Sequence, residues 1–272
     1  MPLTALQAEI LALLAPHRTP SSHLAGATGL LMSSSSPRRS QDLDLFHDAE
    51  QEVALAFAAD RAGLVARGFQ VAVSLSQPGF IRAEVGRPDG GGTVRVDWAH
   101  DSRWRFLPPV NVAGVGYVLH PVDLAVNKVL ALAGRDEPRD FVDILYLIDR
   151  VLPLGALAWA AAGKDPGLNP AMLLDLLARK GRLQQNELDR LDLVRPLPVS
   201  AASALFRTAL QEGRDWIAGR PPGEAGCLYR RPDGARFFAP QRGEACEIHR
   251  GAPGGVMPVL ADGQALSADP AA

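Results

Sequence analysis

The chain has 272 residues, 47% of them hydrophobic and 21% charged, which suits a globular protein with one large domain or two average ones. Its formal net charge of −2 argues against tight non-specific binding to nucleic acid, although a local basic groove is compatible with it. The two cysteines form no Cys-x-x-Cys pair and no apolar run reaches roughly 18 residues, so we expect no zinc site, disulfide framework or membrane span.

The N-terminal segment predicts an amphipathic helix over residues 3–16, because Leu3, Leu6 and Ile10 recur at helical spacing. It has neither the basic start nor the small-residue cleavage site of a signal peptide. With so few cysteines, these features favour a cytoplasmic location and no contact with a membrane.

Small residues follow a short apolar strand. We expect that strand over residues 23–25, followed by a turn at residues 26–29 (Gly-Ala-Thr-Gly) that opens a short helix. Such a turn leaves backbone N–H groups free to face phosphate oxygens. Arg38, Arg39 and Ser40 follow downstream, so the segment combines a phosphate cradle with basic and hydroxyl groups.

Residues 42–46 read Asp-Leu-Asp-Leu-Phe, and this alternation predicts a half-buried strand. Asp42 and Asp44 then share one face, with their Cα atoms about 6.5–7 Å apart. Two carboxylates on one face repel each other unless a cation lies between them, and oxygen-only ligands favour Mg²⁺ or Mn²⁺. A lone Asp-x-Asp is most often a pair of solvated surface carboxylates, but the turn and the arginines upstream favour a metal site.

This segment resembles the nucleotidyltransferase superfamily of DNA polymerase beta type, in which a Gly-Gly or Gly-Ser turn precedes Asp-x-Asp on the next strand. It is similar more narrowly to the AbiEii/AbiGii-type toxin nucleotidyltransferases, which read Gly-Gly-Thr-Ala-Leu, a spacer, and Arg-x-Ser-x-Asp-hydrophobic-Asp-Leu-Phe. The matching residues are 26–30 (GATGL) and 38–46 (RRSQDLDLF). Ala27 stands where the family has glycine or serine, and its Cβ is expected to crowd a triphosphate.

A helix is predicted over residues 49–67 and strands over residues 69–75, 80–85 and 93–98, with a hairpin turn at Asp89-Gly90-Gly91-Gly92. The last strand carries Asp97. The resemblance implies a third carboxylate on a neighbouring strand, which would complete the metal site and activate the attacking hydroxyl. Asp97 is equally a candidate for a strand-end carboxylate paired with Arg95 or Arg103, and the sequence leaves both interpretations open.

A second motif begins at Pro121, which suits the first turn of a helix that carries Lys128. Arg135 follows, and Asp140 and Asp143 then lie on one face of the next helix. This block resembles the second signature of the AbiEii-like family. The resemblance implies that Lys128 contacts the nucleotide phosphates and that the two carboxylates hold Lys128 and Arg135 or touch the nucleotide. The structural alternatives are a surface lysine and a helix-terminal aspartate.

The predicted fold class is α+β. We expect a mixed-sheet nucleotidyltransferase domain over residues 1–120, an α-helical domain with the second motif over residues 121–220, and an irregular tail over residues 221–272. The tail suggests a small β-hairpin around Asp233-Gly234.

The resemblance implies Mg²⁺-dependent transfer of a nucleoside monophosphate from an NTP to tRNA or protein, by a toxin with a separate antitoxin. Mn²⁺ is an alternative metal. The implied catalytic residues are Asp42, Asp44, Asp97 and Lys128, the first three of which bind the metal. The implied nucleotide-binding residues are Gly26, Ala27, Thr28, Arg38, Ser40, Lys128, Asp140 and Asp143. Two other functions stay open: a small-molecule, antibiotic-type nucleotidyltransferase, and a degenerate nucleotide-binding module, which Ala27 keeps in consideration.

Overall fold

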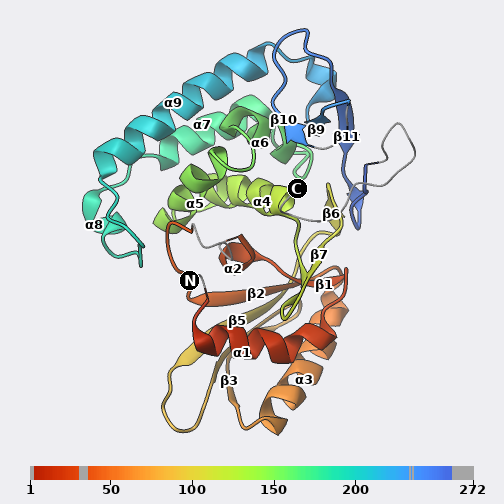
Figure 1. Ribbon diagram of the computed structural model, residues 1–272, viewed down its shortest axis with the longest axis vertical. Coiled ribbons are helices and arrows are strands. Elements are labelled where there is room, and N and C mark those ends of the chain that lie inside the picture. Colours follow the sequence, from red (N-terminus) through yellow and green to blue (C-terminus); the bar gives the residue numbers. More distant parts are fainter. Residues whose placement is uncertain (1–2, 31–35, 233, 235, 259–272) are drawn as a thin grey trace. The chain divides into compact units, whose positions relative to one another are not determined.

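The computed structural model describes residues 3–30, 36–232, 234 and 236–258. It consists of two compact units (Figure 1). The first contains Met1–Arg103 and Pro108–His120, and the second contains Trp104–Leu107 and Pro121–Ala272. The chain therefore leaves the first unit for four residues and returns to it before it enters the helical region.

The first unit is built on a seven-stranded sheet with the order β3-β4-β5-β2-β1-β8-β7. Its strands are β1 (Ser22–Leu24), β2 (Asp42–His47), β3 (Gln70–Gln77), β4 (Phe80–Gly86), β5 (Thr93–His100), β7 (Val110–Val112) and β8 (Gly116–Val118). Strand β2 is parallel to β5 and antiparallel to β1, and β1 is parallel to β8. The remaining pairs are antiparallel hairpins, so the predicted mixed sheet is confirmed.

Helices α1 (Ala5–Leu14), α2 (Gly26–Leu30) and α3 (Glu50–Ala66) accompany this sheet, with a 3-10 turn, η1, at Ala15–His17. Helix α1 starts at a capping box: Thr4 Oγ1 accepts from the Gln7 N–H at 3.1 Å, and Gln7 Oε1 accepts from the Thr4 N–H at 2.9 Å. The buried residues of α1 and α3 join those of the sheet in one hydrophobic core, to which Leu43, Leu45 and Trp98 contribute.

A buried charged group ties α3 to its neighbours. Asp60 on α3 is fully buried and accepts hydrogen bonds from Arg18 Nη2 at 2.7 and 2.8 Å and from Trp98 Nε1 at 2.8 Å. His17 Nδ1 lies 2.7 Å from the same carboxylate. Because a buried carboxylate is tolerated only when it is paired and hydrogen-bonded, these contacts fix the position of α3.

The second unit is mainly helical, as predicted. Its helices are α4 (Pro121–Gly134), α5 (Pro138–Ile148), α6 (Leu154–Ala161), α7 (Pro170–Lys180), α8 (Gln185–Leu188) and α9 (Val199–Ala218). Helix α6 is buried along its whole length and contacts α4, α7 and α9. It crosses α9 at Gly155 and Gly213, where a Cβ on Gly155 would lie 2.8 Å from the Gly213 Cα, so the close crossing requires glycine.

The chain after α9 packs as part of this second unit. A three-residue 3-10 turn, η2 (Pro222–Glu224), leads into a sheet of order β10-β9-β11, formed by β9 (Cys227–Arg230), β10 (Phe237–Phe238) and β11 (Glu247–Arg250). The Trp216 ring on α9 makes edge contacts with Trp159 and Tyr229, at centroid distances of 6.0 and 5.9 Å. Asp233, in the predicted hairpin turn, and residues 259–272 lie outside the described residues.

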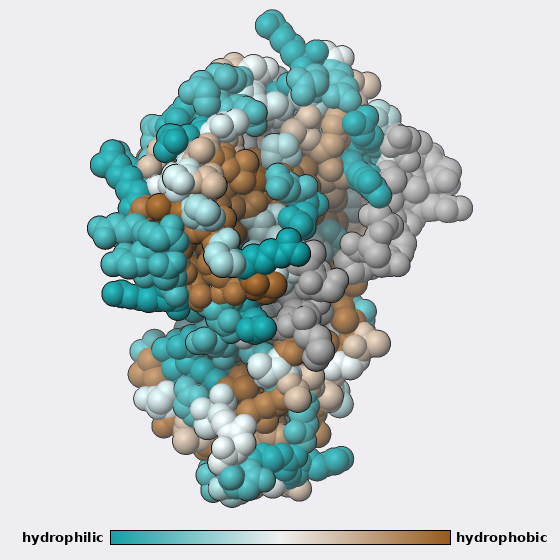
Figure 2. Space-filling model, turned by 60° about the vertical axis from the view of Figure 1, so that its left-hand side comes forward, coloured by the Kyte–Doolittle hydropathy of each residue, from teal (hydrophilic) through white to brown (hydrophobic). Residues whose placement is uncertain are grey.

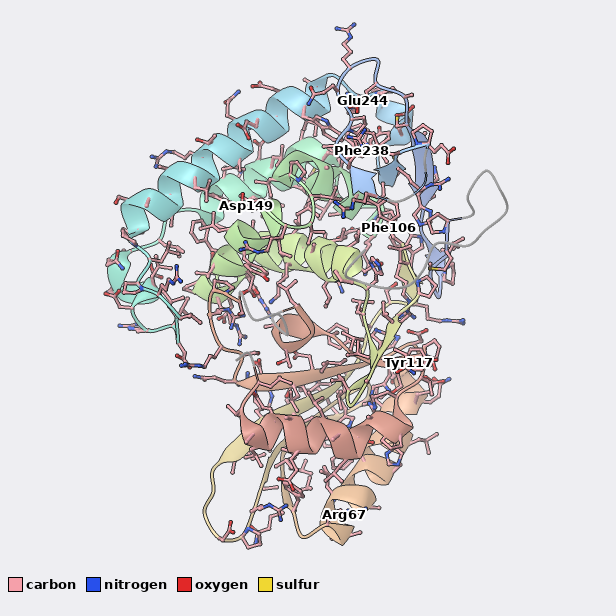
Figure 3. All side chains as sticks on the ribbon, viewed as in Figure 1. Arg67, Phe106, Tyr117, Asp149, Phe238 and Glu244 are labelled. Atoms are coloured by element: carbon pink, nitrogen blue, oxygen red, sulfur yellow. The ribbon has the colours of Figure 1, made fainter. Side chains whose placement is uncertain are left out.

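The segment Trp104–Leu107 is anchored in the second unit from two sides. Strand β6 (Trp104–Arg105) pairs with β12 (Ala252–Pro253), and the Phe106 ring, labelled in Figure 3, contacts Trp104 at a centroid distance of 4.9 Å. Asp123 on α4 accepts hydrogen bonds from the Phe106 and Leu107 N–H groups at 2.8 and 2.9 Å. Burial raises the pKa of Asp123 to about 6, against the opposing effect of Lys164 and these N–H groups.

Within the described part of the chain, no helix is long and apolar enough to cross a membrane. Figure 2 shows hydrophobic side chains as patches among hydrophilic ones. The large exposed hydrophobic residues include Leu55, Val65 and Val73 in the first unit and Met172 and Val194 in the second.

His47, at the end of β2, is an ionisable residue inside the core of the first unit. Its side chain is 1% exposed, and neither ring nitrogen has a hydrogen-bond partner among the described residues. Burial and the Arg18 charge lower the pKa of His47 to about 4, with Asp60 acting in the opposite direction. The imidazole is therefore neutral in the folded protein, although it titrates near pH 6.5 in an unfolded chain.

We expect acid to destabilise the protein through His47. Between pH 6.5 and about 4 the unfolded chain binds a proton that the folded chain does not, so the free energy of unfolding falls across this window, by up to about 3 kcal/mol. Urea unfolding at about pH 7 and about pH 4.5 measures the difference, which should shrink in His47→Gln. The exposed His100 on the neighbouring strand provides the control, His100→Gln, which should keep the wild-type difference. An unchanged pH dependence in His47→Gln would refute this assignment.

Candidate functional site

The turn after β1 lies directly against one of the predicted catalytic carboxylates. The Ala25 N–H donates to the Asp44 carbonyl at 2.8 Å, and Gly26 follows with φ = +60°. A Cβ on Gly26 would lie 1.7 Å from Asp44 Oδ2. Both the backbone conformation and the available space therefore require glycine at position 26, and the structure brings the turn and Asp44 together.

Two hydroxyl groups of the motif hold Asp42 in place. Thr28, which is buried, donates from Oγ1 to the Asp42 carbonyl, and Ser40 Oγ donates to Asp42 Oδ1 at 3.0 Å. Gln7 Nε2 on α1 in turn donates to the Ser40 carbonyl at 2.8 Å. Ala27 and Arg38 are also buried. In this structure Thr28 and Ser40 position a carboxylate, and their contact with a triphosphate stays a prediction.

The three predicted metal ligands share one face of the sheet. Asp42 and Asp44 alternate with the fully buried Leu43 and Leu45 along β2, and the parallel register sets Asp44 directly beside Asp97 on β5. Residues directly opposite each other on neighbouring strands point to the same face. The strand periodicity and the β2–β5 pairing thus place all three carboxylates opposite the hydrophobic core.

Two arginines on the same face pair with these carboxylates. Arg82 on β4 is the register partner of Asp97 and binds it with two hydrogen bonds, from Nε to Oδ1 at 2.8 Å and from Nη2 to Oδ2 at 2.6 Å. Arg95 on β5 is the register partner of Asp42 and donates to its Oδ2. The hydrogen bond with Asp97 raises the pKa of Arg82, so the guanidinium stays charged.

Sequence reasoning proposed Arg95 or Arg103 as the partner of Asp97 and missed Arg82. A signal was present in the β4–β5 hairpin, whose turn lies at Asp89-Gly90-Gly91-Gly92. Counting outwards from that turn pairs Arg82 with Asp97 and Glu84 with Arg95. The register of the predicted hairpin therefore specifies that Arg82, and not Arg95 or Arg103, lies opposite Asp97.

The donor chemistry of the three carboxylates fits Mg²⁺ or Mn²⁺, since all the ligands are oxygens and they lie on adjacent strands. In the described residues, however, no group of three or more His, Cys, Asp or Glu side chains is arranged to hold a metal ion. Asp42 and Asp97 instead face guanidinium groups. The assignment of Asp42, Asp44 and Asp97 as metal ligands stays a prediction, and binding there would require at least the two arginine-paired carboxylates to rearrange.

The second motif forms a separate buried cluster within the second unit. Lys128 Nζ on α4 lies 2.9 Å from Asp140 Oδ1 and 2.9 Å from Asp143 Oδ2, both on α5. Arg135 Nε donates to Asp140 Oδ2 at 2.6 Å. Asp140 and Asp143 are fully buried and Lys128 is 7% exposed. The predicted role of the two carboxylates in holding Lys128 agrees with this geometry, whereas a solvated surface lysine does not.

Charge pairing determines the ionisation of this cluster. Burial disfavours the ammonium of Lys128, but Asp143 and Asp140 outweigh it and the pKa of Lys128 is raised. Burial likewise opposes ionisation of Asp140, and the hydrogen bond from Arg135 together with the Lys128 charge lowers its pKa nonetheless. The side chains of Lys128, Arg135, Asp140 and Asp143 thus form a balanced group of two positive and two negative charges.

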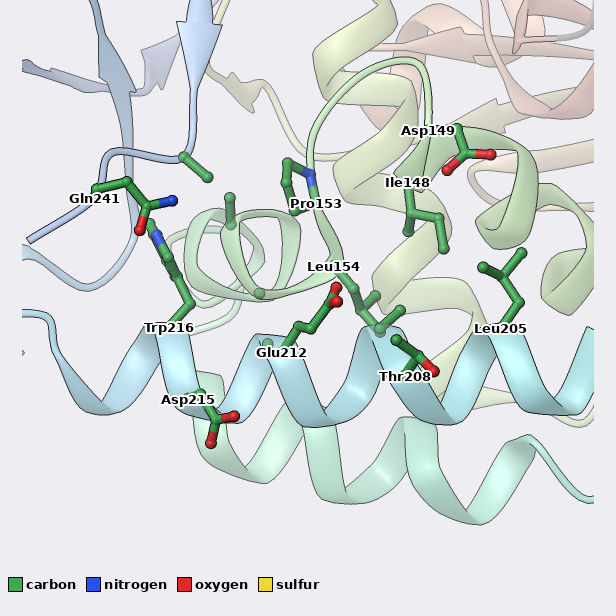
Figure 4. Close-up of a pocket in the computed structure, with 15 residues that line it drawn as sticks. Ile148, Asp149, Pro153, Leu154, Leu205, Thr208, Glu212, Asp215, Trp216 and Gln241 are labelled. Carbon is green, nitrogen blue, oxygen red and sulfur yellow. The ribbon is translucent and has the colours of Figure 1, made fainter.

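The second unit also contains an open pocket of about 690 Å³ between α6, α9 and the chain after β10 (Figure 4). Asp149, Glu212 and Asp215 line it together with Trp216 and Gln241. In Figure 4 Glu212 extends from α9 towards Leu154, whereas Asp215 points to the other side of the helix. None of the residues predicted for the site lines this pocket.

The model of the family described as "Nucleotidyl transferase AbiEii toxin, Type IV TA system" matches residues 12–215. No curated protein sequence matches the chain significantly. Among solved structures, MenT4, the nucleotidyltransferase toxin Rv2826c from Mycobacterium tuberculosis H37Rv, superposes with a TM-score of 0.55 at 16% identity, over 77% of this chain and 82% of that one.

Two structures from Helicobacter pylori also match, each with a TM-score of 0.48. One is JHP933, at 17% identity over 78% of this chain and 90% of that one. The other is a putative nucleotidyltransferase, at 16% identity over 79% of this chain and 98% of that one. At 16% identity, the likeness to MenT4 shows the fold alone. The family model spans well over half of the chain and includes both motifs, so this protein belongs to the AbiEii family of nucleotidyltransferase toxins.

Proposed function

We propose that this toxin transfers a nucleoside monophosphate from an NTP to a tRNA or protein acceptor in a Mg²⁺-dependent reaction, and that a separate antitoxin opposes it. The observation that carries the proposal is the set of three carboxylates on one face of β2 and β5, beside the Gly26 turn. The family description, which names a nucleotidyl transferase toxin of a Type IV toxin–antitoxin system, supports the toxin role and the antitoxin.

In the proposed mechanism, Asp42, Asp44 and Asp97 would hold the metal, and Asp97 would also receive the proton of the attacking acceptor hydroxyl. A bound metal would neutralise charge on the phosphates and stabilise the attacking and leaving oxygens. A bond forms between the acceptor oxygen and the α-phosphorus while the bond from the α-phosphorus to the bridging oxygen breaks, and pyrophosphate leaves. The Gly26 turn lets the backbone approach the triphosphate, because no side chain stands between the turn and Asp44.

Label transfer tests this function directly. Purified protein is incubated with Mg²⁺, each α-labelled NTP in turn, and either total tRNA or a cell protein extract. We expect label on one acceptor class, and a loss of at least about 100-fold in Asp44→Asn and Asp97→Asn, because these changes remove a metal ligand and the base. Asp101→Asn, a change just beyond β5, is the matched control and should retain activity. Full transfer by Asp44→Asn would contradict the metal site, and label on neither acceptor class would contradict the proposed acceptors.

A second experiment tests whether Lys128 contacts the nucleotide phosphates, as the family resemblance implies. The double variant Lys128→Met/Asp143→Asn removes one positive and one negative charge and leaves Asp140 paired with Arg135, so the buried cluster stays balanced. We expect it to fold and to bind NTP about tenfold more weakly, which is the loss of one hydrogen bond to a charged group. Arg214→Met/Asp175→Asn, which removes an exposed ion pair between α9 and α7, is the control and should keep the wild-type affinity. Equal NTP affinity in all three proteins would make this cluster purely structural.

A further inference from the structure

Arg82 and Arg95 lie on the same face of the sheet as the three carboxylates, and neither belongs to the sequence motifs. Their side chains are each 36% exposed, whereas those of their partners Asp97 and Asp42 are 8% exposed. The two guanidinium groups therefore lie towards solvent over carboxylates that are nearly buried. Phe80 stacks beneath Arg82, with its ring centroid 5.2 Å from the guanidinium carbon, and confines that side chain to the sheet surface.

A guanidinium and a divalent cation compete for the same carboxylate lone pairs. Arg82 engages both oxygens of Asp97, and Arg95 engages one oxygen of Asp42 while Ser40 engages the other. The two ion pairs neutralise part of the negative charge that would otherwise attract a cation to this face. Metal ligation by these oxygens requires the arginines to move away.

The arginines have a suitable alternative partner in a triphosphate. The planar guanidinium forms parallel hydrogen bonds with phosphate as readily as with carboxylate. Arg95 contacts Asp42 through Nη2, and its side chain is 36% exposed. The guanidinium can therefore be reached by an anion from the solvent side.

We propose that Arg82 and Arg95 are phosphate-binding residues that occupy Asp97 and Asp42 before the nucleotide arrives, and that turn to its phosphate oxygens when metal takes the carboxylates. The inference rests on the proposed nucleotidyl transfer. It adds two phosphate-binding residues, and it states that the arginines leave the carboxylates only when metal and nucleotide bind. Metal alone binds weakly because the guanidinium groups hold its carboxylate ligands. Metal and triphosphate bind strongly together, because the carboxylates then pair with the metal and the arginines pair with the phosphates.

The test measures two affinities that should change in opposite directions. Mn²⁺ is titrated into the full-length protein without nucleotide and followed by electron paramagnetic resonance. Arg82→Met and Arg95→Met should each lower the Kd for Mn²⁺ about tenfold, because a competing positive charge is removed. In the presence of Mg²⁺, the same variants should raise the Kd for an α,β-methylene NTP, tried with each base, about tenfold.

Arg87→Met is the matched control. Arg87 follows β4 and pairs with Glu9 on α1, and its side chain is 38% exposed, so it matches Arg82 in ion pairing and burial away from the carboxylates. It should change neither affinity. If Arg82→Met folds poorly, the uncharged but polar Arg82→Gln replaces it. The rise in Tm on adding Mn²⁺ gives a second measure of metal binding, and it should exceed that of the wild type.

An unchanged Mn²⁺ affinity in both arginine variants would overturn the competition, and an unchanged analogue affinity would overturn the phosphate contact. A purely structural role predicts that both affinities weaken together, which would also refute the proposal. These outcomes are separate from those of label transfer. Opposite changes without label on any acceptor would sustain the arginine assignment and reject the proposed acceptors.

Discussion

Electrostatic repulsion among Asp42, Asp44 and Asp97 is the constraint on which the first unit depends. The apolar residues between them on β2 and β5 must enter the core, so the three carboxylates are forced onto the opposite face. Such a surface is unstable without positive charge. Arg82 and Arg95 supply it from their register positions, while the hydroxyl groups of Thr28 and Ser40 fix the strand and side chain of Asp42. The contacts within the candidate site thus also stabilise the sheet.

Buried charge is handled differently at three places in the chain. Asp60 is fully enclosed and shares its oxygens with Arg18, Trp98 and His17, which suits a group that holds elements together. Lys128 sits between two buried carboxylates in a balanced cluster. The pairs at Arg82 and Arg95 are instead partly exposed, and exposed pairs exchange partners at lower cost in desolvation. Of the three, the pairs on the sheet face are the best suited to respond to a ligand.

The family assignment and the structural likenesses carry different weight. The family model covers both motifs and identifies a nucleotidyltransferase toxin. MenT4, at 16% identity and a TM-score of 0.55, shows a shared fold without transferring substrates or partners. The residues after α9 lie beyond the family match, yet they pack against Trp159 and Trp216 and stabilise the helical unit through aromatic contacts. Their contribution is therefore to the second unit rather than to the recognised motifs.

Local sequence determined the elements that depend on periodicity and turn chemistry: the Asp-Leu-Asp-Leu strand, the hairpin before Thr93, the helix with Lys128, and the family motifs on them. The sequence placed Gly26 in a turn that opens a helix, and only the structure shows that a Cβ there would meet the Asp44 carboxylate. Tertiary structure alone decided the pairing of Arg95 with Asp42, the inward hydroxyl of Thr28, and the capture of Trp104–Leu107 by β12 and Asp123. The physical reason is that periodicity specifies which face a side chain occupies, whereas its partner depends on strand register and on chain segments up to about 150 residues away, whose approach follows from packing of the whole unit.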